Sequence, residues 1–146
     1  MNLADKLVEI SIGSKLELID VVTLSADHLC KLAGFDEEEQ YRVNLSVRES
    51  LANAIEHGNK FADHKMVEVV LRLNEEVFSV TIRDHGEGFD PNQVPNPLDP
   101  QNLLNPDGRG ILYMRSFMDE VTLIRHAEGG MQITMIKNRL TLVTEG

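Results

Sequence analysis

Apolar residues recur with two different periods along the chain, and this alternation limits the folds that it can adopt. A two-residue period, typical of half-buried strands, occurs in five segments, namely 7–13, 66–74, 77–84, 121–126 and 131–138. Spacing of three to four residues, typical of amphipathic helices, occurs at 14–32, 36–57 and 108–120. The expected order is therefore strand, helix, helix, two strands, a long loop, helix and two strands.

Short connections join the later strands in pairs. Only Glu75 and Glu76 separate the second strand from the third, and Gly129 with Gly130 lies at the turn between the last two. Such connections form antiparallel hairpins, whereas a parallel pair needs a crossover of a dozen or more residues. We therefore expect an α+β fold: a two-layer α/β sandwich with a mixed, mostly antiparallel sheet and helices on one face.

The two long helices differ in how clearly the sequence defines them. In the first, before a stop at Gly34, the apolar positions have mostly helical spacing and are Leu16, Ile19, Val22, Leu24, Leu29 and Leu32. The second begins with a capping box, Asp36 with Glu39, and ends at Gly58 and Asn59. Its apolar stripe should face the sheet and comprises Val43, Val47, Leu51, Ala54 and Ile55.

Length and charge exclude several classes of protein. The 146 residues suffice for one domain with a substantial core, so we expect a single domain over residues 1–146. A net charge of −10 would repel a phosphate backbone, which argues against direct nucleic-acid binding. No apolar run approaches the roughly 20 residues that span a bilayer, and the N-terminus lacks a signal-peptide pattern. We expect a cytoplasmic protein without membrane contact, in which the single Cys30 is buried and inert.

Glu49, Asn53 and His57 occupy every fourth position of the second helix, away from its apolar stripe. Residues four apart project in similar directions, about 6 Å from one another along the axis. An Asn oxygen suits Mg²⁺, which takes its other ligands from water and phosphate oxygens. The carboxylate of Glu49 could accept a proton from a hydroxyl group that attacks such a phosphate. A solvated helix face is the commoner explanation for this pattern when it is taken alone.

Asp84 closes the third strand and begins the sequence "DHGEG". A carboxylate at this point can accept hydrogen bonds from an exocyclic amine. Gly86 and Gly88 would let a flat base approach the backbone closely, because glycine has no side chain. An ordinary glycine turn after a strand accounts for the same residues, so this feature alone leaves both interpretations open.

A long proline-containing loop precedes the third helix. Residues 85–107 hold all five prolines of the chain, and we expect a lid at about 90–107. Gly108, Arg109 and Gly110 then open the helix, where free N–H groups and the helix dipole can hold an anion. A helix cap with a tight turn is the simpler interpretation of this glycine pair taken alone.

In this order, the three features resemble the asparagine box, first glycine box, lid and second glycine box of the Bergerat-fold ATPases. That superfamily includes gyrase, the histidine kinases and the mismatch-repair protein MutL, and the resemblance covers nearly the whole chain. The strand-helix-helix start and the segments "NAIEHGN" and "GRGILYMRSFMDEV" are most similar to the bacterial anti-sigma factor serine/threonine-protein kinases.

The resemblance implies roles for the residues of the second helix and the strand end. Asn53 would coordinate Mg²⁺ that bridges the phosphates of ATP, and Glu49 would be the catalytic general base. Asp84 would receive the amino group of adenine. His57 matches the family motif, and its implied role is to hold the loop that follows the helix.

The same resemblance assigns the glycines to the nucleotide. Gly86 and Gly88 would shape the base pocket, while Gly108 and Gly110 would donate backbone N–H groups to the phosphates, with Arg109 between them as a charge partner. Better-known members carry an arginine in the lid shortly before the glycine pair, where this chain has Pro-Asp at 106–107. Either Arg109 substitutes for it or phosphoryl transfer is weakened.

The resemblance implies an ATP-dependent serine/threonine kinase that acts as an anti-sigma factor. It would phosphorylate an anti-anti-sigma antagonist of the STAS type, sequester a sigma factor and form a homodimer. An ATP-gated binding module that transfers no phosphate is the alternative, favoured by the altered lid. A histidine kinase catalytic domain cut from a longer chain is a third hypothesis, which is less favoured because residue 1 lies close to the first strand.

Overall fold

A computed structural model describes residues 5–86 and 114–139 of the chain. Its elements are β1 (Lys6–Gly13), a 3-10 turn (Leu16–Leu18), α1 (Ile19–Ala33), α2 (Glu37–Asn53), a π-helical turn (Ala54–Gly58), β2 (Met66–Leu73), β3 (Val77–Arg83), β4 (Glu120–Arg125) and β5 (Met131–Asn138). Residues 114–117 are also helical, which agrees with the C-terminal part of the third expected helix. The helix ends earlier than the sequence predicted, because residues 118–119 form a bend and Glu120 already begins β4. Residues 108–113 of that helix and the expected lid lie outside the described residues.

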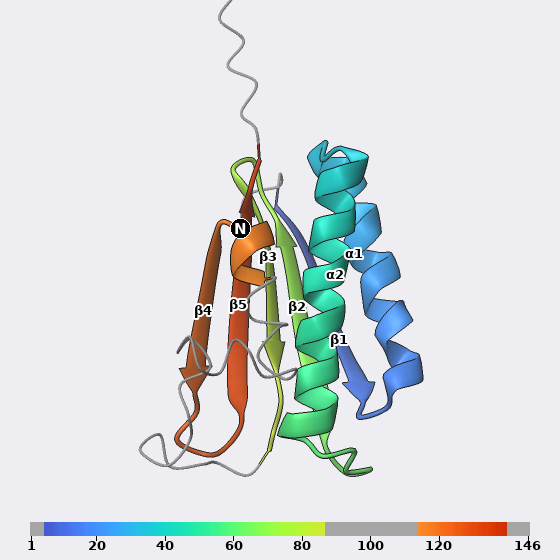
Figure 1. The fold of residues 1–146 in the computed structure, drawn as a ribbon, viewed down its shortest axis with the longest axis vertical. Coiled ribbons are helices and arrows are strands. Elements are labelled where there is room, and N and C mark those ends of the chain that lie inside the picture. The colour runs from blue at the N-terminus through green and yellow to red at the C-terminus, as the bar shows by residue number, and fades with distance from the viewer. Residues whose placement is uncertain (1–4, 87–113, 140–146) are drawn as a thin grey trace, which may run out of the picture.

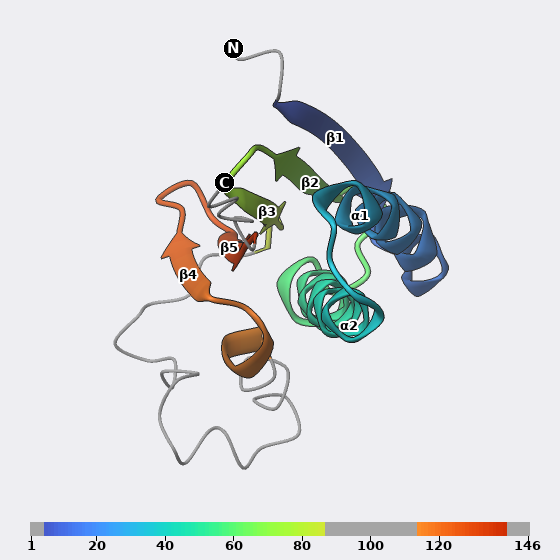
Figure 2. The ribbon, with the colours of Figure 1, turned by 90° about the horizontal axis from the view of Figure 1, so that it is seen from above.

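The five strands form one sheet in the order β1-β2-β3-β5-β4, and every neighbouring pair is antiparallel. Helices α1 and α2 pack side by side against one face of this sheet (Figures 1 and 2). The predicted α+β two-layer sandwich is therefore confirmed. Among the described strands the sheet is wholly antiparallel rather than mixed.

Helix α2 has the start and the buried face that the sequence predicts. The Asp36 carboxylate accepts from the backbone N–H of Glu39, and the Glu39 side chain accepts from the N–H of Asp36 in return. This capping box satisfies two donors that a helix start leaves without partners. All five residues of the predicted stripe are buried in the core, namely Val43, Val47, Leu51, Ala54 and Ile55. The stripe packs toward the sheet and fixes which side of α2 faces away from it.

Helix α1 differs from the sequence prediction in which residues it buries. Leu16, Leu24 and Leu32 were expected in its apolar face, but their exposed fractions are 43%, 68% and 47%. The buried positions instead include smaller residues such as Thr23 and Ala26. Helix α1 packs against both α2 and the sheet, so its buried side is set by two neighbours rather than by one apolar stripe. Gly34 ends the helix in the left-handed conformation, with φ of 86°.

The two hairpins have the predicted connections. The Asn74 side chain accepts from the N–H groups of Glu76 and Val77, both at 2.8 Å, and closes the turn between β2 and β3. Gly129 and Gly130 both have positive φ in the turn between β4 and β5. The two hairpins meet where β3 pairs with β5, and Arg83 there lies opposite Gln132, so the end of β3 lies beside the start of β5.

Two further sequence expectations have a structural counterpart. Cys30 is buried in α1, and burial raises the pKa of its thiol to about 12, so that the thiol remains protonated and unreactive. None of the helices within residues 5–86 and 114–139 is long and apolar enough to cross a membrane.

Replacing leucine by alanine at a buried and an exposed position tests the assignment of helix faces. Leu51→Ala should lower the free energy of unfolding by about 2–5 kcal/mol, because it leaves a cavity in the core. Leu24→Ala makes the same chemical change on the exposed side of α1 and should alter that free energy by less than about 0.5 kcal/mol. Urea unfolding of both variants is the measurement, and a large loss for Leu24→Ala would contradict the observed packing of α1.

Candidate functional site

The C-terminal end of the helix that carries Glu49, Asn53 and His57 is not a regular α-helix. After Asn53 the chain forms a π-helical turn over Ala54–Gly58, in which the N–H of Asn59 donates to the carbonyl of Ala54 at 2.8 Å. The sequence predicted a regular helix as far as His57. The wider turn changes the direction of side chains after Asn53, so His57 does not simply continue the row formed by Glu49 and Asn53. Its side chain is half exposed and its ring lies 3.9 Å from the Glu56 carboxylate.

Glu49 and Asn53 lie on regular α-helix, one turn apart, outside the buried stripe of α2. Both side chains are partly exposed, and neither forms a hydrogen bond or ion pair with any described residue. A carboxylate and an amide oxygen one turn apart are therefore open to a ligand. Asn53 is also the last residue before the π-helical turn, a feature that often marks a functional site.

Asp84 follows β3 directly and is the single buried acidic residue within residues 5–86 and 114–139, with 6% of its surface exposed. Its Oδ1 accepts from the backbone N–H of Gly86 at 3.0 Å and of Met131 at 3.1 Å. These two bonds offset part of the cost of burying the charge. No described residue donates to Oδ2, so this oxygen remains able to accept a hydrogen bond from a ligand.

The end of the helix packs directly against the strand end that carries Asp84. A Cβ atom placed on Gly58 would overlap the Asp84 carboxylate, and one on Gly86 would overlap the carbonyl oxygen of Gly58. From the other side, a Cβ on Gly130, whose φ is +90°, would overlap the carbonyl of Asp84. The structure thus brings together the asparagine-box helix, Asp84 and Gly86, and only glycine at these positions permits the approach.

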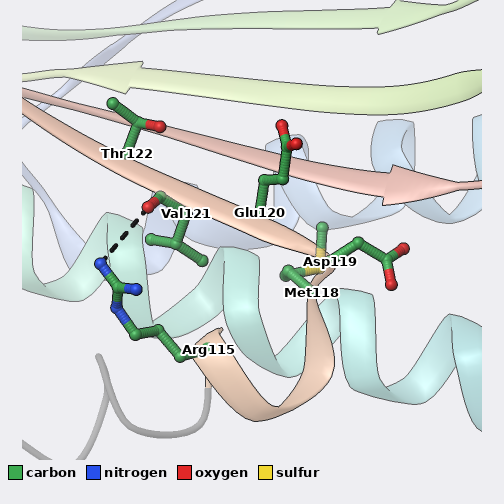
Figure 3. A pocket seen from close by; sticks show the side chains of 6 residues that line it. All are labelled: Arg115, Met118, Asp119, Glu120, Val121 and Thr122. Carbon is green, nitrogen blue, oxygen red and sulfur yellow. Dashed lines mark hydrogen bonds between the residues drawn. The ribbon is translucent and has the colours of Figure 1, made fainter.

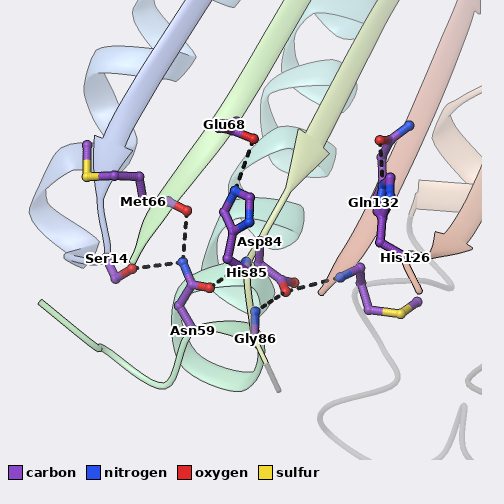
Figure 4. A network of polar contacts seen from close by, with 10 residues as sticks. Ser14, Asn59, Met66, Glu68, Asp84, His85, Gly86, His126 and Gln132 are labelled. Carbon is purple, nitrogen blue, oxygen red and sulfur yellow. Dashed lines mark hydrogen bonds and ion pairs between the residues drawn. The ribbon is translucent and has the colours of Figure 1, made fainter. Parts of the chain in front are cut away.

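Asn59 is a site residue that the sequence reasoning treated only as the end of a helix. It is buried, with 2% exposed, and its amide reaches three separate elements (Figure 4). Its Nδ2 donates to Ser14 Oγ at 3.0 Å and to the Met66 carbonyl at 3.1 Å, and its Oδ1 accepts from the N–H of His85 at 2.7 Å. The only sequence feature that could have indicated this role is the position of a polar residue directly after Gly58.

Four of the predicted site residues cannot be placed. Gly88, Gly108, Arg109 and Gly110 lie outside the described residues, as does the lid expected at about 90–107. The described part of the candidate site therefore consists of Glu49, Asn53 and His57 on the helix and of Asp84 and Gly86 at the strand end.

A shallow hollow at the other end of the sheet does not belong to this site (Figure 3). It is lined by Arg115, Met118, Asp119, Glu120, Val121 and Thr122. Glu120 pairs with Ile136 on β5, whereas the backbone of Asp84 bonds to Met131 on the same strand. Five residues of extended strand separate these points by about 17 Å. The hollow and the Asp84 site are thus independent of one another.

The described residues offer a ligand one buried acceptor oxygen, on Asp84, and a partly exposed carboxylate and amide on the neighbouring helix. Asp84 Oδ2 is an acceptor without a donor, and the surrounding glycines leave backbone rather than side chains at its border. No group of three or more His, Cys, Asp or Glu side chains that could hold a metal occurs within the described ranges. An ion at Asn53 would therefore need oxygen ligands from water and phosphate, as Mg²⁺ commonly has. The fold is the one that the sequence predicted for a nucleotide-binding domain, and this donor set is compatible with such a ligand.

Comparison with known proteins gives the same class and identifies the family. Residues 12–137 match the histidine kinase-like ATPase domain, so the chain belongs to that family. It is 26% identical over 137 residues to the serine-protein kinase RsbW of Staphylococcus epidermidis, covering 89% of this chain and 85% of that protein. It is 28% identical over 145 residues to RsbW of Bacillus pumilus, covering 94% and 88%, and 24% identical to RsbW of Bacillus subtilis, covering 89% and 84%.

These findings confirm the resemblance to the Bergerat-fold ATPases. Serine-protein kinases among the relatives also agree with the predicted similarity to the anti-sigma factor kinases. The relatives and this chain match over most of their lengths, and the family match spans residues 12–137.

A glycine-to-alanine pair tests the close contact at the site. Gly86→Ala should lower the free energy of unfolding by about 1–3 kcal/mol, because the new methyl group would overlap the rigid backbone at Gly58. Gly13→Ala is the control: its nearest neighbour, Leu18 Cδ1, lies at 3.6 Å, an ordinary contact distance. In urea unfolding, equal midpoints for Gly86→Ala and the parent protein would show that the two backbones are not in tight contact.

Proposed function

We propose that this protein is an ATP-dependent protein serine/threonine kinase that also acts as an anti-sigma factor. The observation that carries the proposal is the contact of Gly58, at the end of the helical segment that holds Asn53, with Asp84, whose Oδ2 receives no hydrogen bond from the described residues. Membership of the histidine kinase-like ATPase family and relatives named as serine-protein kinases support it. The substrate protein would be an anti-anti-sigma antagonist of the STAS type, and the sequestered partner a sigma factor.

ATP recognition would divide between the strand end and the helix. Asp84 Oδ2 would accept the amino group of adenine, while Gly86 and Gly88 border the base. Asn53 would hold Mg²⁺, which supplies positive charge to the phosphates. Gly108 and Gly110 would donate backbone N–H groups to the phosphates with Arg109 beside them, and His57 would hold the loop after the helix.

Phosphoryl transfer would use Glu49 as the general base. A serine hydroxyl of the antagonist attacks the terminal phosphorus, the bond from that phosphorus to the leaving oxygen of ADP breaks, and Glu49 takes the serine proton. Glu49 lies one helical turn from Asn53, about 6 Å along the axis, so the proton acceptor and the metal ligand border the same space. Its partly exposed carboxylate has no described partner that would compete for this role.

The partners would meet an acidic protein. The net charge of −10 favours association with a basic region of a sigma factor, and such attraction weakens as salt increases.

We also propose that the chain folds as one domain over residues 1–146, acts in the cytoplasm and forms a homodimer, as the family resemblance implies. Light scattering at several protein concentrations would test the dimer.

A binding module without phosphoryl transfer is the second candidate. Pro106 and Asp107 stand where the better-known family members carry an arginine in the lid, and this departure favours the second candidate. In that case ATP would favour a conformation that binds the partner, and the antagonist would leave unmodified. Mass spectrometry of the antagonist after incubation with Mg²⁺ and ATP separates the two candidates, because only a kinase adds a phosphate group.

An asparagine substitution tests the role of Asp84 in base recognition. Asp84→Asn should weaken ATP binding by roughly 10- to 150-fold, since a hydrogen bond to a charged group contributes about 1.5–3 kcal/mol. Asp63→Asn, the same change in an exposed loop residue, is the control and should bind ATP like the parent protein. Calorimetric titration with and without Mg²⁺ is the measurement. Unaltered binding by Asp84→Asn would remove Asp84 from the site.

The catalytic role of Glu49 is tested by a change that keeps its shape. Glu49→Gln should leave Mg²⁺-dependent ATP binding within about twofold, because the amide occupies the same volume, but should reduce phosphorylation of the antagonist by at least 100-fold. Glu37→Gln, in the exposed first turn of the same helix, is the control. Phosphorylation is measured as incorporation of the terminal phosphate of ATP into the purified antagonist. Full activity of Glu49→Gln would refute the assignment.

A further inference from the structure

Asn59 directly follows the π-helical turn at the end of α2, which together with α2 is called the site helix below. Its side chain connects this helix to the end of β1, the start of β2 and the segment after β3, and no other described side chain does so. The partners of its amide group fix the orientation of that group. The Met66 carbonyl can only accept, so it faces Nδ2, and the N–H of His85 can only donate, so it faces Oδ1. The residue is 2% exposed, so water does not compete for these bonds. A fully satisfied buried network of this kind holds its members in one arrangement.

The bond between Asn59 and His85 holds the backbone directly after Asp84, the residue whose Oδ2 no described residue uses. His85 lies between Asp84 and Gly86, and its N–H donates to Asn59 Oδ1 at 2.7 Å. The next N–H, of Gly86, donates to Asp84 Oδ1 at 3.0 Å. Successive amides of the strand end are thus held from two sides, once by Asn59 and once by Asp84 itself. The backbone on either side of the Asp84 peptide has little freedom to turn.

The same short segment also supplies the surface against which Asp84 lies. Gly58, which precedes Asn59, touches the Asp84 carboxylate, and its carbonyl oxygen lies against Gly86. Loss of the Asn59 bonds would let Gly58 and the strand end separate, and the direction of Asp84 Oδ2 would then vary. This oxygen is the acceptor that no described residue uses.

We propose that Asn59 is a positioning residue that sets the base selectivity of the site. It holds the Asp84–Gly86 segment so that Asp84 Oδ2 points in one direction before the nucleotide arrives, and it does so without touching the nucleotide. The inference rests on the proposed function, because it assumes that Asp84 receives the amino group of adenine. A preorganised acceptor distinguishes an amine from a carbonyl oxygen at the same ring position more strongly than a mobile one.

Ser14 provides a matched control within the same network. It is 4% exposed, its hydroxyl donates to the Lys65 carbonyl at 2.6 Å, and it accepts from Asn59 Nδ2. It has no bond to His85 or to Asp84. Ser14→Ala therefore lowers stability through the same buried cluster but leaves the bond between Asn59 and His85 in place.

The experiment compares the binding of Mg²⁺-ATP and Mg²⁺-inosine triphosphate. The two bases differ at position 6, an amine in adenine and a carbonyl oxygen in hypoxanthine, and in the hydrogen that hypoxanthine carries on the adjacent N1. Titrations use the whole protein, with and without Asn59→Ala or Ser14→Ala, at a temperature where circular dichroism shows each to be folded. The unsubstituted protein should prefer ATP. Asn59→Ala should weaken ATP binding by about tenfold while inosine triphosphate binding changes by less than about twofold. Ser14→Ala should keep the parent ratio of the two affinities.

The outcomes separate this inference from the proposed function. If the unsubstituted protein binds neither nucleotide, or binds both equally, the proposed role of Asp84 fails. If it prefers ATP but Asn59→Ala keeps the full preference, or weakens both nucleotides equally, Asn59 is a structural residue only and the inference is overturned. Loss of the preference in Ser14→Ala as well would also overturn it, because general loosening would then suffice.

A second measurement needs no variant and applies even if Asn59→Ala does not fold. Amide hydrogen exchange of the nucleotide-free protein, followed by NMR, should show the His85 amide exchanging at least 100-fold more slowly than the unstructured-chain rate. That result is expected if the bond to Asn59 Oδ1 holds the strand end before the nucleotide binds. Exchange of this amide at the unstructured-chain rate would overturn the claim that the acceptor is preorganised.

Discussion

The contact between two backbone segments, Gly58 at the end of the site helix and Asp84–Gly86 at the end of β3, is the constraint on which the candidate site depends. Neither segment has room for a Cβ atom where it meets the other. The contact is closed by hydrogen bonds from both sides, to Asn59 and to Asp84 Oδ1. Helix α2 continues into a π-helical turn, and the last residue of that turn, Gly58, makes this contact.

Much of the fold could be predicted from the sequence, since it follows from local patterns. The two-residue period predicted all five strands, and the Asp36–Glu39 pair predicted the start of α2. The outward side of α1 could not be predicted in the same way. Leu24 looks like a core residue by its type, but 68% of it is exposed, because α1 turns another side inward, the side that carries Val22, Ala26 and Leu29. Such a choice depends on which neighbour a helix meets, and a single helix pattern does not contain that information.

The candidate site likewise has features that follow from local sequence and features that depend on distant partners. The spacing of Glu49 and Asn53 and the position of Asp84 after a strand are local, and the sequence predicted them. The π-helical turn, the buried amide of Asn59 and the approach of Gly130 to Asp84 depend on partners far away in the sequence. Asn59 shows the difficulty well: asparagine after glycine is an ordinary helix end, and only the positions of Ser14, Met66 and His85 make it a buried connector.

The strongly acidic composition is compatible with an anionic ligand because the local arrangement, rather than the net charge, decides the energy of binding. Charges farther apart than about 8–10 Å in water are largely screened at physiological salt, whereas a buried donor or acceptor acts at full strength. Asp84 has already lost most of its water on folding, and two backbone N–H groups replace only part of it. A ligand amine that bonds to Oδ2 would restore a partner that folding removed, so the cost of burying this carboxylate is met before the ligand binds. The same buried carboxylate that is unfavourable for folding is therefore favourable for recognition, provided that the surrounding backbone keeps it in one place.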